Sequence, residues 1–397
     1  MDAVFGVTHD IFTSQFQQSD LETLSNRALS NGIALYIKKD YEGAAKEFKR
    51  SVGLAPNGPN SATAGDYLAQ AYLKLDKTEK AMSAYKTAAE LNPQRDDIRI
   101  KLGDIRYFEG QYEEAEIDYN EAVRINPSAE NHYSLGLLYW QTEQYGKAEG
   151  QFKQVLRLGP KDGYGNYGLG LVYNKEGQHE QAIAQFKETI RLNKDFINAY
   201  AYLGYAYADN GQMDKAGEQI EILEDEDSPL ADTLQNYIIK VSDPQIIAAY
   251  ASSSINGFSY NAPRKTLVSA LDSYLEAANT SKSFTMKFIF SKKMDLASVE
   301  NRFNWGISRA SGGMPGQPYN FDLPIPSTEV TIAHFPDSIA YDPLSQTAMV
   351  TFTIRQNAEA DGTIDPSHIV FKFVGKDQDG YTMDPHADEF TGFSGVA

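Results

Sequence analysis

Residues 103–127, GDIRYFEGQYEEAEIDYNEAVRINP, decide the fold of the N-terminal half of this chain. Small, aromatic and proline residues stand at fixed places in the stretch, at Gly103, Ala115, Tyr119, Ala122 and Pro127. An earlier copy of this pattern ends at Pro93, which lies 34 residues before Pro127. A period of this length is typical of stacked helical repeats. Six copies of the pattern cover about residues 25 to 223.

The other five copies repeat a small residue, a second small residue and a large apolar residue. These sets are Gly32, Ala44 and Phe48; Ala69, Ala81 and Tyr85; Gly136, Ala148 and Phe152; Gly170, Ala182 and Phe186; and Gly204, Ala216 and Ile220. A small side chain lets the two helices of a copy approach closely, and the large one fills the space between them. One copy cannot bury its apolar face alone, so the copies must stack on one another.

This pattern resembles the tetratricopeptide (TPR) family. The resemblance implies an α-solenoid of helix pairs with a concave groove, built from six units over residues 25–227. Residues 1–24 form an apolar segment before the first unit. After the last unit, Ser228 and Pro229 are suited to begin a helix. We therefore predict a capping helix over residues 228–242.

In TPR proteins the first helix of each unit lines the groove, and this implies a groove rich in aromatic residues. The residues at the groove positions are Ile33, Tyr36, Tyr107, Phe108, Tyr133, Leu137, Trp140, Tyr164, Tyr167, Leu171 and Tyr205. Aromatic side chains are effective anchors for a partner. The alternative is that some of them only pack between repeats. The charged clamp with which some family members hold acidic C-terminal peptides is not expected here.

The first residues of the chain are too apolar for a terminal segment that makes no contacts. The apolar ones are Val4, Phe5, Val7, Ile11, Phe12 and Phe16. One interpretation is an extra helix that caps the first repeat. The other is a segment that docks into the groove or sheet of a neighbouring molecule, a contact that propagates into filaments.

The C-terminal part has a different period. Residues 283–290, 329–332, 348–354 and 368–373 are β-rich, and most of them alternate between apolar and polar residues. Turn signals separate these stretches at 311–313, 315–316, 361–362 and 379–380. Short strands punctuated by such turns predict an all-β sandwich over residues 243–397.

Two stretches of this part, residues 288–299 and 373–384, resemble the bacterial immunoglobulin-like domains of surface and S-layer proteins. The resemblance implies an Ig-like sandwich that acts as a spacer or adhesion module. The fold class predicted for the whole chain is therefore a TPR α-solenoid followed by an Ig-like β-sandwich.

The composition excludes several functions. The formal net charge of −18 disfavours nucleic acid and anionic membranes as partners. The absence of cysteine excludes disulfides and thiol chemistry. No apolar run approaches the roughly 18 residues of a membrane span. The six histidines are scattered, so we expect neither a metal centre of histidines nor an enzyme.

Two motifs still suggest ligands. The segment 163–168 matches GxGxxG, but a nucleotide site requires a strand before it, and a helix is predicted there instead. Carboxylates also gather around Gly380, where calcium would be the fitting ion. The weak candidate ligands for calcium are Asp377, Asp379, Asp384 and Asp388. A solvated acidic turn is the alternative.

The sequence thus favours a protein–protein interaction scaffold that binds a peptide in its groove and uses its β-domain as a spacer or docking module. A self-assembling protein of a surface layer or filament is the alternative, in which the partner is another copy of the chain. The N-terminus has no secretory signal, which points to the cytoplasm, while the surface-type β-domain points to the cell exterior.

Overall fold

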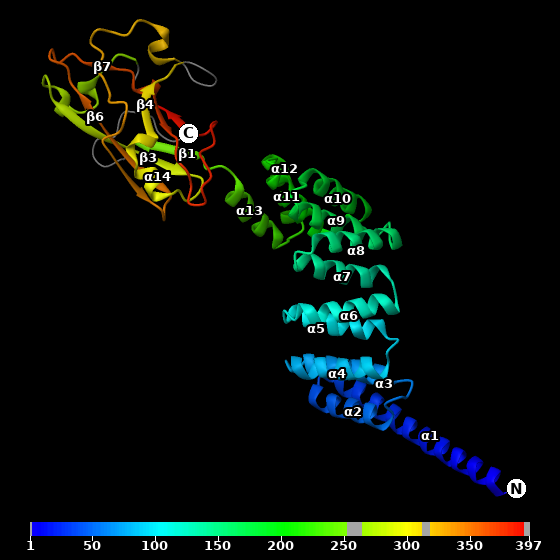
Figure 1. The fold of residues 1–397 in the computed structure, drawn as a ribbon. Helices are drawn as coiled ribbons and strands as arrows, with labels where there is room; N and C mark the ends of the chain where they lie inside the picture. The colour runs from blue at the N-terminus through cyan, green and yellow to red at the C-terminus, as the bar shows by residue number, and fades with distance from the viewer. Residues whose placement is uncertain (1, 252–263, 312–317, 393–397) are drawn as a thin grey trace. The chain divides into compact units, whose positions relative to one another are not determined.

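A computed structural model describes the backbone of residues 2–251, 264–311 and 318–392, with side chains from residue 18 onward. The chain forms two compact units (Figure 1). The first contains Met1–Asn210 and Glu218–Leu230, and the second contains Gly211–Gly217 and Ala231–Ala397. The helix predicted to cap the solenoid, residues 228–242, thus belongs to the second unit from Ala231 onward.

Paired helices make up the N-terminal half, as predicted. They are α1 Asp2–Ile37, α2 Tyr41–Leu54, α3 Ser61–Leu73, α4 Thr78–Leu91, α5 Asp96–Phe108, α6 Tyr112–Ile125, α7 Ala129–Gln141, α8 Tyr145–Leu158, α9 Tyr164–Lys175, α10 His179–Leu192, α11 Ile197–Asp209, α12 Met213–Asp225 and α13 Leu230–Val241. Within the first unit each pair stacks on the next, so that α2 contacts α3, α4 contacts α5, and so on to α10 and α11.

The recurrent spacing of small and aromatic residues has the packing role that the sequence predicts. A Cβ atom added at Gly136 would lie 2.7 Å from the ring of Phe152, so the glycine admits the ring against the backbone of α7. The same approach occurs in three other repeats. The pairs are Gly32 with Phe48, Gly103 with Tyr119, and Gly170 with Phe186. Each of these rings is buried.

The turn between the two helices of each repeat contains one residue with a left-handed backbone. These residues are Lys39, Asp76, Gly110, Glu143, Gly177 and Gly211, with φ between 54° and 75°. Glycine adopts this conformation at little cost, whereas other residues are strained in it. Tight turns are therefore imposed by helix packing even where the sequence offers no glycine.

The apolar N-terminal segment continues directly into the first repeat. The helix α1 has no break between Asp2 and Ile37. The side chains of the six apolar residues between Val4 and Phe16 lie outside the described residues. Within the described part, Leu21 and Leu24 on α1 are 43% and 44% exposed. No helix in the described ranges is long and apolar enough to cross a membrane.

Antiparallel sheets dominate the second unit. Its strands are β1 Ile246–Ala251, β2 Thr266–Leu267, β3 Ser281–Phe290, β4 Trp305–Arg309, β5 Ser338–Asp342, β6 Thr347–Arg355, β7 Thr363–Ile364, β8 Ile369–Phe373 and β9 Glu389–Thr391. The four-stranded sheet has the order β1-β3-β6-β5, the three-stranded sheet β4-β8-β9, and β2 pairs with β7. The short helix α14 Leu296–Glu300 precedes β4.

Both larger sheets contribute to one core. Phe288 of β3 packs on Trp305 of β4 and on Phe371 of β8, with ring centroids 5.1 and 5.5 Å apart. The strands predicted at 283–290, 348–354 and 368–373 are confirmed as β3, β6 and β8. The strand predicted at 329–332 is wrong, because there only Glu329 forms an isolated bridge, to Thr363.

An ion pair is buried in the second unit. The Lys292 ammonium lies 2.6 Å from the Asp377 carboxylate, and both side chains are buried. The ammonium also donates to the backbone oxygen of Lys240 at the end of α13. The other Asp377 oxygen accepts from the backbone N–H groups of Asp379 and Tyr381. This pair connects helix α13, the end of β3 and the loop around Gly380.

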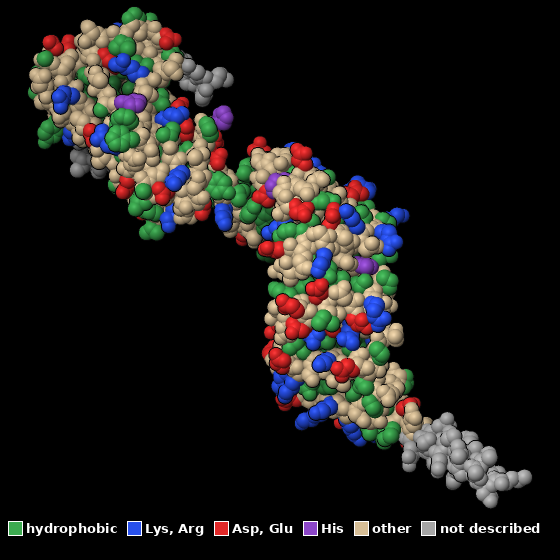
Figure 2. Space-filling view, viewed as in Figure 1, with side chains coloured by type: hydrophobic (Ala, Val, Ile, Leu, Met, Phe, Trp, Pro, Cys, Tyr) green, Lys and Arg blue, Asp and Glu red, His purple; other side chains and the backbone are tan. Residues whose placement is uncertain are grey.

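Charges on the first unit are mixed in sign. On the face of the repeats visible in Figure 2, acidic and basic side chains alternate with apolar ones. Many of these charges pair within a helix, as Arg191 does with Glu188 and Arg124 with Glu121. The visible surface therefore offers no large basic patch to an anionic partner.

Candidate functional site: an aromatic groove

A cavity of about 550 Å³ lies between the first helices of the fourth, fifth and sixth repeats. Helices α7, α9 and α11 and the loop before α11 form its walls. The lining residues are Tyr133, Leu137, Trp140, Tyr164, Tyr167, Leu171, Asn193, Asp195, Phe196, Ile197, Asn198 and Tyr202. Six of the eleven residues placed in the groove by the sequence pattern are in this set.

Aromatic rings contact one another around the cavity. Tyr164 meets Tyr133 at a centroid distance of 5.3 Å and Phe196 at 5.2 Å. Phe196 also meets Tyr167 at 4.8 Å, and Tyr167 meets Tyr202 at 5.7 Å. Each ring is therefore held by its neighbours, which lowers the conformational entropy that a ligand must remove on binding. Tyr164 is the most accessible of the predicted rings here, at 45% exposed.

Glycines in α9 set the position of this wall. A Cβ atom at Gly165 would lie 2.6 Å from the Leu156 backbone, and one at Gly168 would lie 2.2 Å from the Phe152 ring. Because these two glycines have no side chain, α9 packs tightly on α8, and Tyr164 and Tyr167 are thereby positioned in the groove. The GxGxxG match is thus accounted for by helix packing, and the segment before it is a helix, as predicted.

Several polar side chains line the cavity, among them Asn193, Asp195 and Asn198. The Trp140 indole N–H donates to the backbone oxygen of Leu171 at 3.2 Å, which fixes the indole between two repeats. The Asn193 side chain accepts from the Asp195 N–H at 3.0 Å and shapes the loop. Burial raises the pKa of the Tyr133 and Tyr167 phenols above its usual value, so both stay neutral at physiological pH.

The other five predicted groove residues lie elsewhere on the unit. Ile33 and Tyr36 pack against the core of the first repeats, where Tyr36 contacts Tyr67. Tyr107 and Phe108 contact each other on α5, and Phe108 is 83% exposed. Tyr205 contacts Tyr202, which itself lines the cavity. The aromatic residues thus form one concentrated site, together with packing contacts outside it.

Sequence reasoning missed the contribution of the loop before α11. Phe196 closes the cavity between Tyr164 and Tyr167, although it precedes the helix and lies outside the groove positions. One signal was available. The residue at the same place before the earlier repeats is polar, namely Gln94, Ser128 or Asp162, and only here is it aromatic.

The four aspartates proposed for calcium do not converge. Asp377 is paired with Lys292, Asp388 with Lys372 at 3.1 Å, and Asp384 accepts from Gln245. Across the described residues, no three acidic or histidine side chains are grouped so that they could hold a metal ion. The carboxylates of Asp377, Asp384 and Asp388 thus each have a protein partner.

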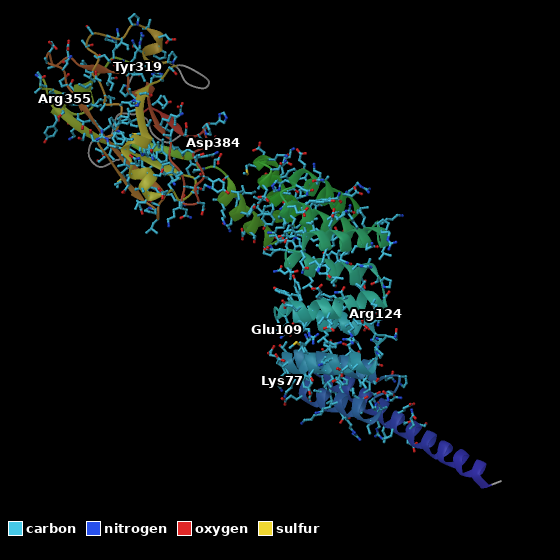
Figure 3. All side chains as sticks on the ribbon, in the orientation of Figure 1. Lys77, Glu109, Arg124, Tyr319, Arg355 and Asp384 are labelled. Atoms are coloured by element: carbon cyan, nitrogen blue, oxygen red, sulfur yellow. The ribbon has the colours of Figure 1, made fainter. Side chains whose placement is uncertain are left out.

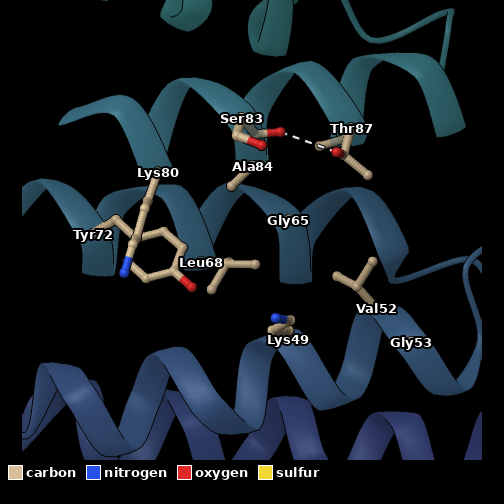
Figure 4. A pocket seen from close by; sticks show the side chains of 11 residues that line it. Lys49, Val52, Gly53, Gly65, Leu68, Tyr72, Lys80, Ser83, Ala84 and Thr87 are labelled. Atoms are coloured by element: carbon tan, nitrogen blue, oxygen red, sulfur yellow. Dashed lines mark hydrogen bonds between the residues drawn. The ribbon is translucent and has the colours of Figure 1, made fainter. Parts of the chain in front are cut away.

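A second cavity in the first unit, of about 510 Å³, lies between α2, α3 and α4. Small residues open it, and a Cβ atom at Gly65 would lie 2.7 Å from Ala88. Figure 4 shows Tyr72 and Lys80 at one end and Thr87 at the other. The Thr87 hydroxyl donates a hydrogen bond to the backbone oxygen of Ser83, which belongs to the same helix.

The second unit contains a cavity of about 320 Å³ beside Tyr319, which Figure 3 labels. The Tyr319 hydroxyl donates to the Glu329 carboxylate and accepts from the Asp365 N–H. The Arg309 guanidinium lies 3.8 Å from the same carboxylate. Burial raises the pKa of Glu329 to about 7, although Arg309 opposes this shift.

This pKa predicts a pH dependence of stability. The Glu329 pKa is higher in the folded state than in the unfolded chain. Its contribution to the free energy of unfolding is therefore complete below about pH 4.5 and is lost as pH rises through about 7. We expect Glu329→Gln to reduce the decline in unfolding free energy between pH 5 and 8 by roughly 1 to 3 kcal/mol. Urea unfolding followed by Trp305 fluorescence in a Trp140→Phe background measures this decline, and identical pH profiles for both proteins would contradict the assignment.

Family models match the helical repeats. A model described as TPR repeat matches residues 103–143 and 170–211, and one described as tetratricopeptide repeat matches residues 68–95 and 129–162. The helical part of the chain therefore carries TPR repeats, and such repeats generally mediate protein–protein interactions.

Individual relatives are similar over about a third of the chain. The BBSome complex member BBS4 of Mus musculus is 26% identical over 129 residues, which are 32% of this chain and 24% of that protein. A TPR repeat-containing protein of Methanocaldococcus jannaschii is 28% identical over 135 residues, 32% of this chain and 22% of that protein. The chain thus spans about a quarter of the length of these relatives. The crystal structure of a tetratricopeptide repeat protein from Parabacteroides merdae aligns with a TM-score of 0.49 and 21% identity, covering 54% of this chain and 86% of that one.

Proposed function

We propose that this protein is an interaction scaffold that binds a peptide segment of a partner in the aromatic groove of repeats four to six. The observation that carries the proposal is the cavity between α7, α9 and α11, where side chains from three successive repeats meet. Its β-rich unit, which resembles Ig-like domains, then serves to space or dock the scaffold.

The size and chemistry of the groove support a peptide ligand. A cavity of about 550 Å³ holds a few side chains, and this lies within the usual range for binding sites. Binding energy in such sites concentrates in a few aromatic anchors. Tyr164 is accessible to a ligand, while Tyr167 and Leu171 form a buried floor. The groove therefore favours a segment with at least one large side chain inserted between the repeats.

Substitution of the accessible ring tests the groove. A peptide is first selected from a random display library against the full chain, and its affinity is measured by calorimetry. We expect Tyr164→Ala to weaken binding by about 2 kcal/mol, roughly 30-fold, because it removes a central aromatic anchor. Ile117→Ala is the matched control, since Ile117 is 65% exposed on α6 outside the groove. Equal losses in both variants would contradict binding at the groove.

Self-assembly is a second candidate, and one observation favours it. Leu21 and Leu24 present apolar surface on the long helix α1, next to the apolar residues of the N-terminal segment. Exposed apolar side chains on one helix are suited to contact another copy.

Sedimentation across a concentration series tests this second candidate. We expect the mass of the wild-type chain to rise with concentration and that of a Leu21→Glu, Leu24→Glu chain to remain monomeric. A wild-type mass that does not change with concentration would rule out self-assembly.

A further inference from the structure

The rings of the groove meet at steep angles. The planes of Tyr133 and Tyr164 differ by 69°, those of Tyr164 and Phe196 by 63°, and those of Tyr167 and Tyr202 by 87°. Rings in different orientations, from three successive repeats, thus line one cavity. The face of an aromatic ring is negative, so such an arrangement attracts a cation more strongly than a neutral group of the same shape.

The carboxylates near these rings have the charge that complements a cation. Asp195 lines the groove cavity from the loop before α11. Glu130 and Asp162 line an adjoining cavity of about 340 Å³, which shares the walls Tyr133 and Tyr164. The whole chain has a formal net charge of −18. An approaching cation is therefore attracted both by the chain and by the groove.

One ring of the groove, that of Trp140, already lies near an ammonium group of the chain itself. The Lys175 side chain, at the exposed end of α9, places its nitrogen 5.9 Å from the centre of the Trp140 ring. Trp140 is the strongest type of cation–π partner, and its orientation is fixed by the bond to Leu171. A cation from a ligand would take the place of this flexible and solvated lysine.

We propose that the aromatic groove recognises an alkylammonium group, presented as a lysine side chain of the bound peptide. The ring faces of Tyr164 and Trp140 contact the cation, and Asp195 supplies the opposite charge. This inference rests on the proposed function, because the cation enters the same groove as the peptide. It adds that the partner segment is basic at the place where it meets repeats four to six.

The experiment compares a cation with its neutral isostere on the full chain. The probes are choline and 3,3-dimethyl-1-butanol, which have the same shape and differ in charge. The chain has two tryptophans, so two indole N–H signals report binding in ¹⁵N NMR spectra. Trp140 lies in the groove, and the buried Trp305 of the second unit is an internal control. We expect choline to shift the Trp140 signal in a saturable way, at least about threefold more tightly than the isostere.

Three variants test separately the contributions of the Tyr164 ring, the Tyr164 hydroxyl and the Asp195 carboxylate. Tyr164→Phe keeps the ring face and should retain the preference for choline, whereas Tyr164→Leu should abolish it. Asp195→Asn should weaken choline and leave the isostere unchanged. Equal affinities of the two probes, or binding of neither, would overturn the cation inference. The display-selected peptide separates failure of the cation inference from failure of the proposed function. If this peptide binds less tightly to Tyr164→Ala, peptide binding in the groove is supported whether or not a cation is recognised.

Discussion

Gly165→Val is expected to destabilise the first unit by about 3 kcal/mol or more, the typical upper end for overpacking. A Cβ atom at this position would lie 2.6 Å from both the Cα and the N atom of Leu156. These are backbone atoms of the neighbouring helix, so no rotamer change can relieve the clash. Helix α9 would have to move away from α8, and this would separate the fourth repeat from the fifth.

The control for this prediction lies on the neighbouring helix. Gly150 is exposed within α8, and an added Cβ atom would have no neighbour within 4 Å. Gly150→Ala should therefore stabilise the chain by about 0.5 to 1 kcal/mol, because alanine is the better helix former. Thermal unfolding followed by circular dichroism at 222 nm measures both variants. A Gly165→Val chain as stable as the wild type would show that α8 and α9 do not pack as described.

Lys292→Met is expected to destabilise the second unit by about 3 to 5 kcal/mol. Methionine matches the length of the lysine stem but lacks the charge. The Asp377 carboxylate would then remain buried without its cation, and the bond to the Lys240 backbone oxygen at the end of α13 would be lost. Such an uncompensated charge is among the largest costs that a single substitution causes.

Two further variants identify the cause of this loss. Lys293→Met changes the adjacent, exposed lysine and should alter stability by less than about 0.5 kcal/mol. Adding Asp377→Asn to Lys292→Met should recover part of the stability, since an amide oxygen can still accept from the N–H groups of Asp379 and Tyr381. Urea unfolding of these variants in a Trp140→Phe background, followed by Trp305 fluorescence, gives the values. A double variant no more stable than Lys292→Met alone would contradict the buried charge as the cause.

The repeats could be predicted because their packing depends on residue size at fixed spacing. Gly136 and Phe152 lie sixteen residues apart in the sequence, and the structure presses one against the other. The left-handed turns were harder to predict from the sequence. Glu143 and Asp76 adopt positive φ, a conformation that the sequence reveals only where glycine occupies the same place.

Part of the cavity lining follows helix periodicity. Tyr133, Trp140 and Tyr164 stand at expected groove positions, and they line the cavity because the first helix of each repeat presents the same positions to it. Phe196 and Asn193 were missed because the path of a loop is set by tertiary packing rather than by a period. The role of Phe196 depends on its contact with the Tyr164 ring, which is close in space but about thirty residues earlier in the chain.

The β-rich unit was predictable only in its longest strands. Strands β3 and β6 pair over nine residue positions, from Ser281 with Arg355 to Ile289 with Thr347, and both have a clear alternation. Strand β4 is short and contains Gly306, so its sequence has little strand signal. The segment at 329–332 alternates, yet of its residues only Val330 donates a backbone bond to a strand, to Thr363 of β7. The bond from Ile307 of β4 goes to His334, just beyond the segment.

The central claim is that a partner peptide binds in the aromatic groove, and the indole signal of Trp140 tests it most directly. The full chain is titrated with the display-selected peptide while both indole N–H signals are recorded by ¹⁵N NMR. We predict that the Trp140 signal shifts and saturates at the affinity measured by calorimetry, while the Trp305 signal stays in place. A peptide that binds by calorimetry but leaves the Trp140 signal unchanged would contradict the claim.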